Sequence, residues 1–308
     1  MRRRDFLIAS ATLAALASRR PAHALGTRAA RSPGLRFGYA AITWGGDDPR
    51  AIDEIAALGF EGIQLRASAV ERWGEKPDEL KSLLAARGLT MVALSSGVVA
   101  LDPARERETL ALHERNARFV RDAGGLYLQV LDERPPDRAP TAEELRRMGR
   151  LLSELGRRTA DLGVPLGLHN HMGNLSQSPD EVARVLGASD PRHVKLELDV
   201  AHWHQAGGDP ATAVRAYRDR LLFLHIKDVE SPAPGRGPES YRFVELGRGR
   251  VNLPAVFMAL REISFDGWAV VELDAVPDKA RTPTASGEIA KDYLRGLGYS
   301  IARPSTPG

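Results

Sequence analysis

The sequence predicts a single (β/α)8 barrel, a TIM barrel of the α/β class, and three observations lead to this prediction. Short apolar segments alternate with helical stretches, which is the order of parallel β/α units. Eight such apolar segments occur along the chain. Four of them end in clusters of histidine, carboxylate and lysine side chains. Because the carboxyl ends of barrel strands meet on one face, these clusters are expected to surround one point.

The eight expected strands occupy residues 35–40, 62–65, 90–94, 126–130, 165–169, 194–199, 222–226 and 268–273. Helices fill the gaps between them and carry recognisable ends. Thr141 and Ser178 are each followed three residues later by glutamate, the pattern of a capping box at a helix start. Gly59, Gly88 and Gly163 each lie between a helical stretch and a strand, where a left-handed residue ends the helix.

Residues 229–250 lie in the longest connection between two expected strands and are rich in Gly, Pro and Ser. A long loop without regular structure inside a compact domain is usually functional. On the catalytic face of a barrel, such an insertion predicts a lid or a substrate-binding loop.

The first 24 residues predict a signal peptide of the twin-arginine type. Arg3 and Arg4 precede an apolar run at residues 6–18, and an Ala-x-Ala cleavage site ends at Ala24. The run is too short to span a membrane, and no cysteine follows it to carry a lipid, so no stable membrane anchor is expected. We therefore expect a periplasmic protein with a linker at residues 25–34, a barrel at 35–302 and a tail at 303–308.

Charge and cysteine content exclude several classes of protein. The whole chain has 43 basic and 40 acidic residues, and removal of the signal peptide leaves 38 basic and 39 acidic residues. A nucleic-acid-binding protein normally keeps a basic surplus on its folded part, so no nucleic-acid partner is expected. The chain has no cysteine, so any metal ion must be held by nitrogen and oxygen ligands.

The four clusters point toward the barrel axis. Side chains alternate along a strand, so residues two apart share a face. The pairs that share the inward face are His169 with His171, Glu197 with Asp199, His225 with Lys227, and Glu272 with Asp274. Interleaved Leu, Ile and Val residues face the helices. A barrel without a binding or catalytic site would fill its interior with aliphatic side chains. The polar clusters therefore predict a divalent metal site with nearby proton-transfer groups.

These clusters also carry a resemblance to a known family. The segments 169–173, 198–203 with 206–210, 225–229 and 267–274 resemble the xylose-isomerase-like barrel superfamily. Within it, they are most similar to the inosose dehydratase and sugar isomerase/epimerase branch. The resemblance extends over about residues 35–301. It implies a metal-dependent isomerase, epimerase or dehydratase that acts on a small carbohydrate.

The resemblance implies that Asp199, His225 and Glu272 are metal ligands. The fourth ligand, on strand five, is usually glutamate in the epimerases, but His169 stands there in this chain. His171 shares the inward face and is the alternative ligand. Strand two often carries glutamate in the family, whereas this chain has Gln64, which can bind a hydroxyl group but cannot act as a base.

A metal ion next to a substrate carbonyl favours loss of the neighbouring proton, which can lead to epimerisation, isomerisation or dehydration. The candidate acids and bases are His171, then His202, then Lys227, although Lys227 is about equally well explained as an ion-paired or hydroxyl-binding residue. The candidate ligands suit Mn²⁺, Co²⁺ or Zn²⁺, and we favour Mn²⁺. The residues expected to bind substrate are Gln64, Gln129, Asn170, Trp44 and Asp228.

Two other functions fit the same fold. An AP-endonuclease-like nuclease would need more inward ligands on the early strands, where only Gln64 and Gln129 occur, and a basic surface that the mature chain lacks. A non-catalytic sugar-binding barrel is the stronger alternative, because His169 and Gln64 both differ from the commonest pattern of the family.

Overall fold

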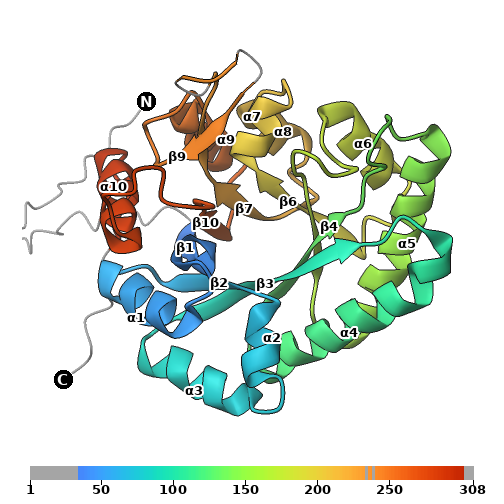
Figure 1. Cartoon of the computed structure of the whole chain (residues 1–308), viewed down its shortest axis with the longest axis horizontal. Coiled ribbons are helices and arrows are strands. Elements are labelled where there is room, and N and C mark those ends of the chain that lie inside the picture. The colour runs from blue at the N-terminus through green and yellow to red at the C-terminus, as the bar shows by residue number, and fades with distance from the viewer. Residues whose placement is uncertain (1–33, 233–234, 238–239, 302–308) are drawn as a thin grey trace, which may run out of the picture. The chain divides into compact units, whose positions relative to one another are not determined.

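The computed structural model describes residues 34–232, 235–237 and 240–301. Within them, eight parallel strands close into a barrel in the order β1-β10-β7-β6-β5-β4-β3-β2 (Figure 1), which confirms the predicted fold. The barrel strands are β1 (Arg36–Ala40), β2 (Gly62–Arg66), β3 (Thr90–Val99), β4 (Tyr127–Asp132), β5 (Leu166–His169), β6 (Val194–Asp199), β7 (Leu221–Ile226) and β10 (Trp268–Val271). Each matches a predicted strand. The predicted signal peptide and tail lie outside the described residues.

Helices cover the outside of the barrel. They are α1 (Asp48–Leu58), α2 (Ser68–Trp73), α3 (Pro77–Ala86), α4 (Glu106–Asp122), α5 (Ala142–Asp161), α6 (Pro179–Gly187), α7 (Val200–Gln205), α8 (Pro210–Ala216), α9 (Leu253–Glu262) and α10 (Pro283–Gly296). Both predicted capping boxes are present, with Thr141 at the start of α5 and Ser178 at the start of α6. Gly59 ends α1 in the left-handed conformation with φ of 94°, as predicted.

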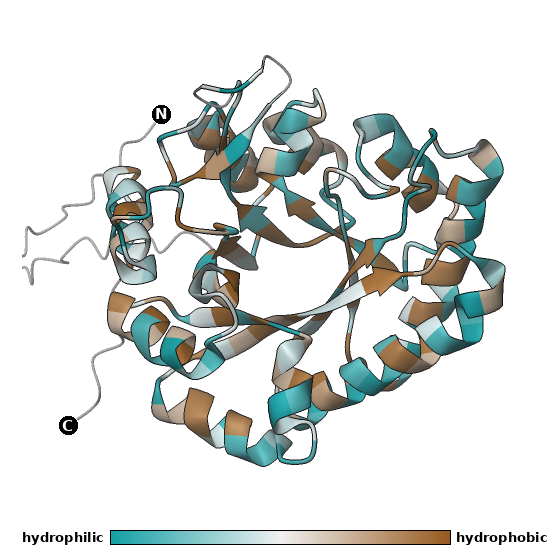
Figure 2. Cartoon of the chain, viewed as in Figure 1, coloured by the Kyte–Doolittle hydropathy of each residue, from teal (hydrophilic) through white to brown (hydrophobic). Residues whose placement is uncertain are grey.

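Two apolar clusters show that the strand faces alternate as the sequence predicted. The larger cluster lies between barrel and helices and includes Leu168, Leu198 and Leu224. Figure 2 shows apolar residues along the strands and in bands on the surrounding helices. The smaller cluster fills the inside of the barrel with residues such as Phe223 and Trp268. Since Phe223 lies two residues before His225 on β7, the inward face changes from apolar to polar toward the carboxyl end of the strand.

The segment predicted as a lid contains a small antiparallel sheet. Strand β8 (Asp228–Glu230) pairs with β9 (Arg242–Val244), and these strands form a sheet separate from the barrel. The ring of Phe243 on β9 lies over the ammonium group of Lys227, with 3.9 Å between Nζ and the ring centroid. The segment therefore covers part of the face on which the strands end. None of the described helices is long and apolar enough to cross a membrane.

Candidate metal centre and substrate pocket

Four of the predicted side chains meet at one point of the barrel. His169, Asp199, His225 and Glu272 are all buried and each offers one ligand atom, and these four atoms lie within 4.8 Å of one another. They come from the ends of β5, β6 and β7 and from the residue directly after β10. Among the described residues, this is the group that the sequence predicted to bind one divalent ion.

The atoms that face this point have few partners in the protein. His225 Nδ1 lies 3.6 Å from Asp199 Oδ2 and 3.4 Å from Glu272 Oε2. Both Nδ1 of His225 and Oδ2 of Asp199 are buried without a hydrogen-bond partner. Buried polar atoms normally have one, so these atoms fit a site whose missing partner is a cation. Two imidazoles and two carboxylates suit a borderline divalent metal ion.

Gln64 orients His225 for this role. The Nε2–H group of His225 donates to Gln64 Oε1 at 2.7 Å, which leaves Nδ1 facing the two carboxylates. Burial lowers the pKa of His225, but Glu197 and Glu272 outweigh burial and raise that pKa well above its usual range. The surroundings of His225 therefore attract positive charge. Gln64 has a structural role that the sequence did not reveal.

Main-chain contacts fix Asp199. Asn170 donates to the carbonyl oxygen of Asp199 at 3.1 Å and accepts from its N–H group at 2.9 Å. Asp199 Oδ1 accepts from the N–H groups of Ala201 and His202 at the start of α7, so Oδ2 alone faces the ligand group. Both polar atoms of the Asn170 amide thus take part in joining β5 to β6, and contact of Asn170 with substrate stays a prediction.

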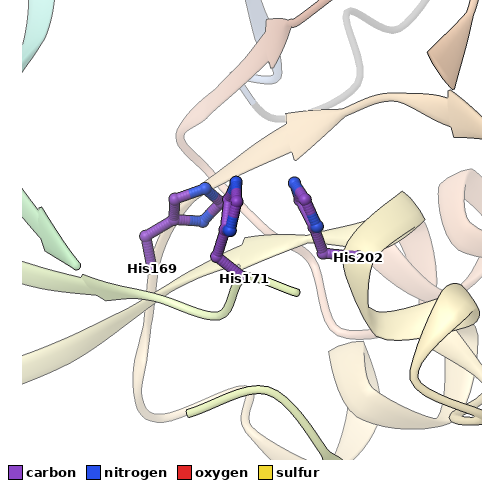
Figure 3. A group of neighbouring side chains, drawn as sticks. All are labelled: His169, His171 and His202. Carbon is purple, nitrogen blue, oxygen red and sulfur yellow. The ribbon is translucent and has the colours of Figure 1, made fainter. Parts of the chain in front are cut away.

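His171 and His202 lie beside this group (Figure 3), and their rings are 3.8 Å apart between centroids. With His169 they form a second group of possible ligand atoms within 4.8 Å of one another. His171 donates from Nδ1 to the carbonyl oxygen of Met172 at 2.6 Å, which leaves a lone pair on Nε2. Burial, followed by the charges of His169 and Lys227, lowers the pKa of His171 to about 4.

His202 does not have a free nitrogen. Its Nδ1 accepts from the N–H group of Met172 at 3.1 Å, and its Nε2 lies 3.3 Å from Lys227 Nζ, a second N–H donor. Burial lowers the pKa of His202 well below its usual range. Because Nδ1 accepts this hydrogen bond, a neutral His202 carries its proton on Nε2, next to Lys227 Nζ; the side chain is 1% exposed, and proton transfer by His202 stays a prediction.

Lys227 is buried among carboxylates. Its Nζ donates to Glu272 Oε1 at 2.9 Å and to Asp274 Oδ1 at 2.5 Å, and lies 3.8 Å from Asp199 Oδ2. Burial lowers its pKa, but these three carboxylates outweigh burial and raise the pKa above its usual value. Lys227 is thus held as an ammonium ion, which agrees with the ion-paired alternative and argues against a role as a base.

A pocket opens above the metal-ligand group. The residues that line it are Ala40, Ile42, Gln64, Arg66, Ser95, Gln129, Leu131, His169, His171, His225, Glu272 and Asp274. Gln64 and Gln129, both predicted to bind substrate, are among them, and Gln129 Oε1 is buried without a hydrogen-bond partner. Their contact with substrate stays a prediction. Arg66 and Ser95 also line the pocket and were not predicted, because separate strands bring them together, whereas Asp274, which lines it too, was predicted to face the barrel axis.

Like Asn170, two further predicted substrate-binding residues are not among the described residues that line this pocket. The indole N–H group of Trp44 donates to Glu54 on α1 at 2.7 Å, which turns the ring toward the helix. Asp228 accepts from the main-chain N–H groups of Val229, Gly247, Gly249 and Val251. Asp228 therefore holds the ends of the lid segment together, and substrate binding by Trp44 and Asp228 stays a prediction.

The fold and the site together define a closed β/α barrel with a candidate metal centre at the carboxyl ends of its strands. The chain belongs to the xylose isomerase-like TIM barrel family, whose model matches residues 52–295.

Named relatives agree with this assignment. The chain is 28% identical over 291 residues to an inosose dehydratase from Lacticaseibacillus casei, and the match covers 84% of this chain and 96% of that protein. Two solved structures share the fold, each 19% identical over 85% of this chain. One is an IolI protein with a bound zinc atom, with a TM-score of 0.71 and 98% of its chain covered. The other is an L-ribulose 3-epimerase, with a TM-score of 0.69 and 94% covered.

Proposed function

We propose that this protein is a metal-dependent dehydratase that removes water from a keto-cyclitol or a related keto-sugar. The proposal rests on one observation about the pocket. Among the described residues that line it, His171 is the side chain with a free nitrogen lone pair. It belongs neither to the four-residue metal-ligand group nor to an ion pair. The chemistry of the pocket therefore depends on one base.

A single base favours some reactions over others. Epimerisation removes a proton from one face of a carbon and returns one to the other face, so it needs a second proton-transfer group across the substrate. The pocket residues contributed by β2, β3 and β4 include Gln64, Ser95 and Gln129, which are amides and a hydroxyl group. None of these three titrates near neutral pH. Removal of a proton and departure of a hydroxyl group on the same face need only one base.

The proposed roles follow from this geometry. His171 Nε2 takes the proton from the carbon next to the carbonyl group and returns it to the hydroxyl group on the following carbon. The C–O bond then breaks and water leaves, so that atoms and charge balance. Gln64 and Gln129 are placed to bind substrate hydroxyl groups, and Lys227 balances the charge of Glu272 and Asp274. A divalent ion bound by the four ligands supplies electrophilic stabilisation of the carbonyl oxygen.

Similarity to the inosose dehydratases suggests a keto-cyclitol as the substrate class. Mn²⁺ is the metal ion that we favour for the mixed nitrogen and oxygen ligands, ahead of Co²⁺ and Zn²⁺. We further propose that the protein is exported to the periplasm. The support is the pair Arg3 and Arg4 before an apolar run and a cleavage site at Ala24, all outside the described residues.

The experiment is a screen of the mature, Mn²⁺-loaded protein against inososes and keto-sugars in D₂O, with metal-free protein and His171→Gln as controls. Loss of water together with incorporation of deuterium, seen only with the loaded wild-type protein, supports a dehydratase. Exchange without loss of water contradicts dehydration and supports an isomerase or epimerase. Saturable binding with neither exchange nor loss of water supports the non-catalytic sugar-binding barrel.

A further inference from the structure

Glu197 is a buried carboxylate beneath the metal-ligand group that the roles above do not use. It lies two residues before Asp199 on β6 and points into the barrel, and its side chain is 0% exposed. Its neighbour in the β5–β6 register is His169. Neither of its oxygen atoms has a hydrogen-bond partner. Burying a carboxylate is costly unless polar groups compensate it, so the side chains around this position matter.

The nearest polar atoms belong to two of the proposed metal ligands. Glu197 Oε2 lies 2.7 Å from His169 Nδ1, and Oε1 lies 3.3 Å from His225 Nδ1. Glu197 is not a member of the group whose ligand atoms all lie within 4.8 Å of one another. Its carboxylate therefore lies against two of the four ligand side chains without being one of the four.

We propose that Glu197 is a positioning residue of the metal centre. His169 on β5 stands where a carboxylate would bring a negative charge to the site, and Glu197 on β6 supplies that charge instead. A carboxylate oxygen 2.7 Å from His169 Nδ1 electrostatically favours the tautomer with the proton on Nδ1, which leaves Nε2 of that ring for the ion. Carboxylates that contact metal-binding histidines in this way raise the affinity of the site. The inference rests on the metal site of the proposed function.

The test measures the affinity of the mature protein for Mn²⁺ and Zn²⁺ by competition with a chelator. Glu197→Gln keeps the shape of the side chain and removes its charge, whereas Glu197→Asp keeps the charge and shortens the side chain. We expect Glu197→Gln to weaken metal binding by roughly 10- to 100-fold, and Glu197→Asp to weaken it less. A residue needed only for packing gives the opposite order, with Gln tolerated better than Asp.

Glu245→Gln is the matched control, because Glu245 is a buried carboxylate outside the site that contacts Ser286 and Arg281. It should bind metal as the wild type does. The rise in melting temperature on adding metal should shrink in Glu197→Gln and not in the control, because a ligand stabilises the folded state according to its affinity. An equal loss of melting temperature with and without metal overturns the inference.

Asp199→Ala separates this inference from the proposed function. If Asp199→Ala loses the metal while Glu197→Gln binds it as tightly as the wild type, the role of Glu197 is overturned and the metal site stands. If the wild type itself binds neither ion, both the site and the role of Glu197 are overturned. If Glu197→Gln unfolds, Glu197→Asp decides: a smaller but measurable loss of affinity in Glu197→Asp, with Glu245→Gln at the wild-type value, supports the inference, and wild-type affinity in both variants overturns it.

Discussion

The rings of His171 and His202 lie tilted against each other with their centroids 3.8 Å apart, yet Met172 gives their Nδ1 atoms opposite roles. Its carbonyl oxygen accepts from Nδ1 of His171, and its N–H group donates to Nδ1 of His202. His171 therefore presents a lone pair to the pocket, whereas His202 is held between two donors behind it. Two histidines that look equivalent in the sequence thus differ in what they can do.

Loss of Asp199 should remove the metal ion. Its Oδ2 faces the other ligand atoms and has no hydrogen-bond partner, so Asp199→Ala removes a ligand atom, together with the hydrogen bonds of Oδ1 at the start of α7. We expect near-stoichiometric metal in the purified wild-type protein and little in the variant, measured by elemental analysis. Glu245→Gln, a change to a buried carboxylate outside the site, is the control. Equal metal content in the wild type and Asp199→Ala would contradict the assignment.

His171 and His169 should respond differently to the same substitution. His171→Gln should retain metal and substrate while lowering turnover by roughly two to four orders of magnitude, the usual contribution of a positioned proton-transfer group. His169→Gln should instead weaken metal binding. Steady-state kinetics and metal analysis of both variants check this. The reverse pattern would exchange the two roles, and full activity in both variants would favour the non-catalytic alternative.

Replacement of Lys227 should be costly because its charge balances buried carboxylates. Lys227→Met leaves Glu272 and Asp274 without their common partner. Breaking a buried ion pair on one side typically costs about 3–5 kcal/mol, so we expect a loss of this size in the free energy of unfolding, measured with urea in the presence of a chelator. Asp274→Asn in the same chain should recover part of it. A loss below about 1 kcal/mol would contradict the ion-paired role.

His113 should make the protein less stable in acid. It contacts Ser96 Oγ at 2.6 Å in the core, and burial lowers its pKa from 6.5 to about 4. The unfolded chain therefore binds a proton between these pH values while the folded chain does not. The contribution of His113 is complete above about pH 6.5 and is lost as pH falls to about 4, a change of about 3 kcal/mol.

Urea unfolding of the wild type and of His113→Gln at several pH values measures this contribution. The difference in unfolding free energy between the two proteins should shrink as the pH falls from about 6.5 to about 4. A difference that stays constant across this range would show that His113 is protonated equally in both states.

Export should depend on the two arginines near the start of the chain. Arg3→Lys together with Arg4→Lys should leave the unprocessed precursor in the cytoplasm, because the twin-arginine pathway reads this pair. Cell fractionation and the mass of the protein measure location and cleavage after Ala24. A double variant that still reaches the periplasm in the cleaved form would indicate another route.

The fold was predictable because its signals are local. Strand and helix periods, capping boxes at Thr141 and Ser178, and the glycine after α1 depend on residues a few positions apart. The inward direction of the polar clusters also follows from the two-residue repeat of a strand. The sequence therefore indicated the barrel, the face that carries the site, and the four side chains that meet there.

The tertiary structure alone decided which atoms of these side chains are free. Gln64 contacts His225 across 161 positions of sequence, and Asp228 turns toward main-chain N–H groups around residues 247–251. Trp44 turns toward Glu54 on α1. Rotamers and tautomers are set by partners that lie far apart in the chain or belong to the main chain. Residue type and spacing bring a side chain to the site, but such partners determine whether it binds, moves a proton or only supports its neighbours.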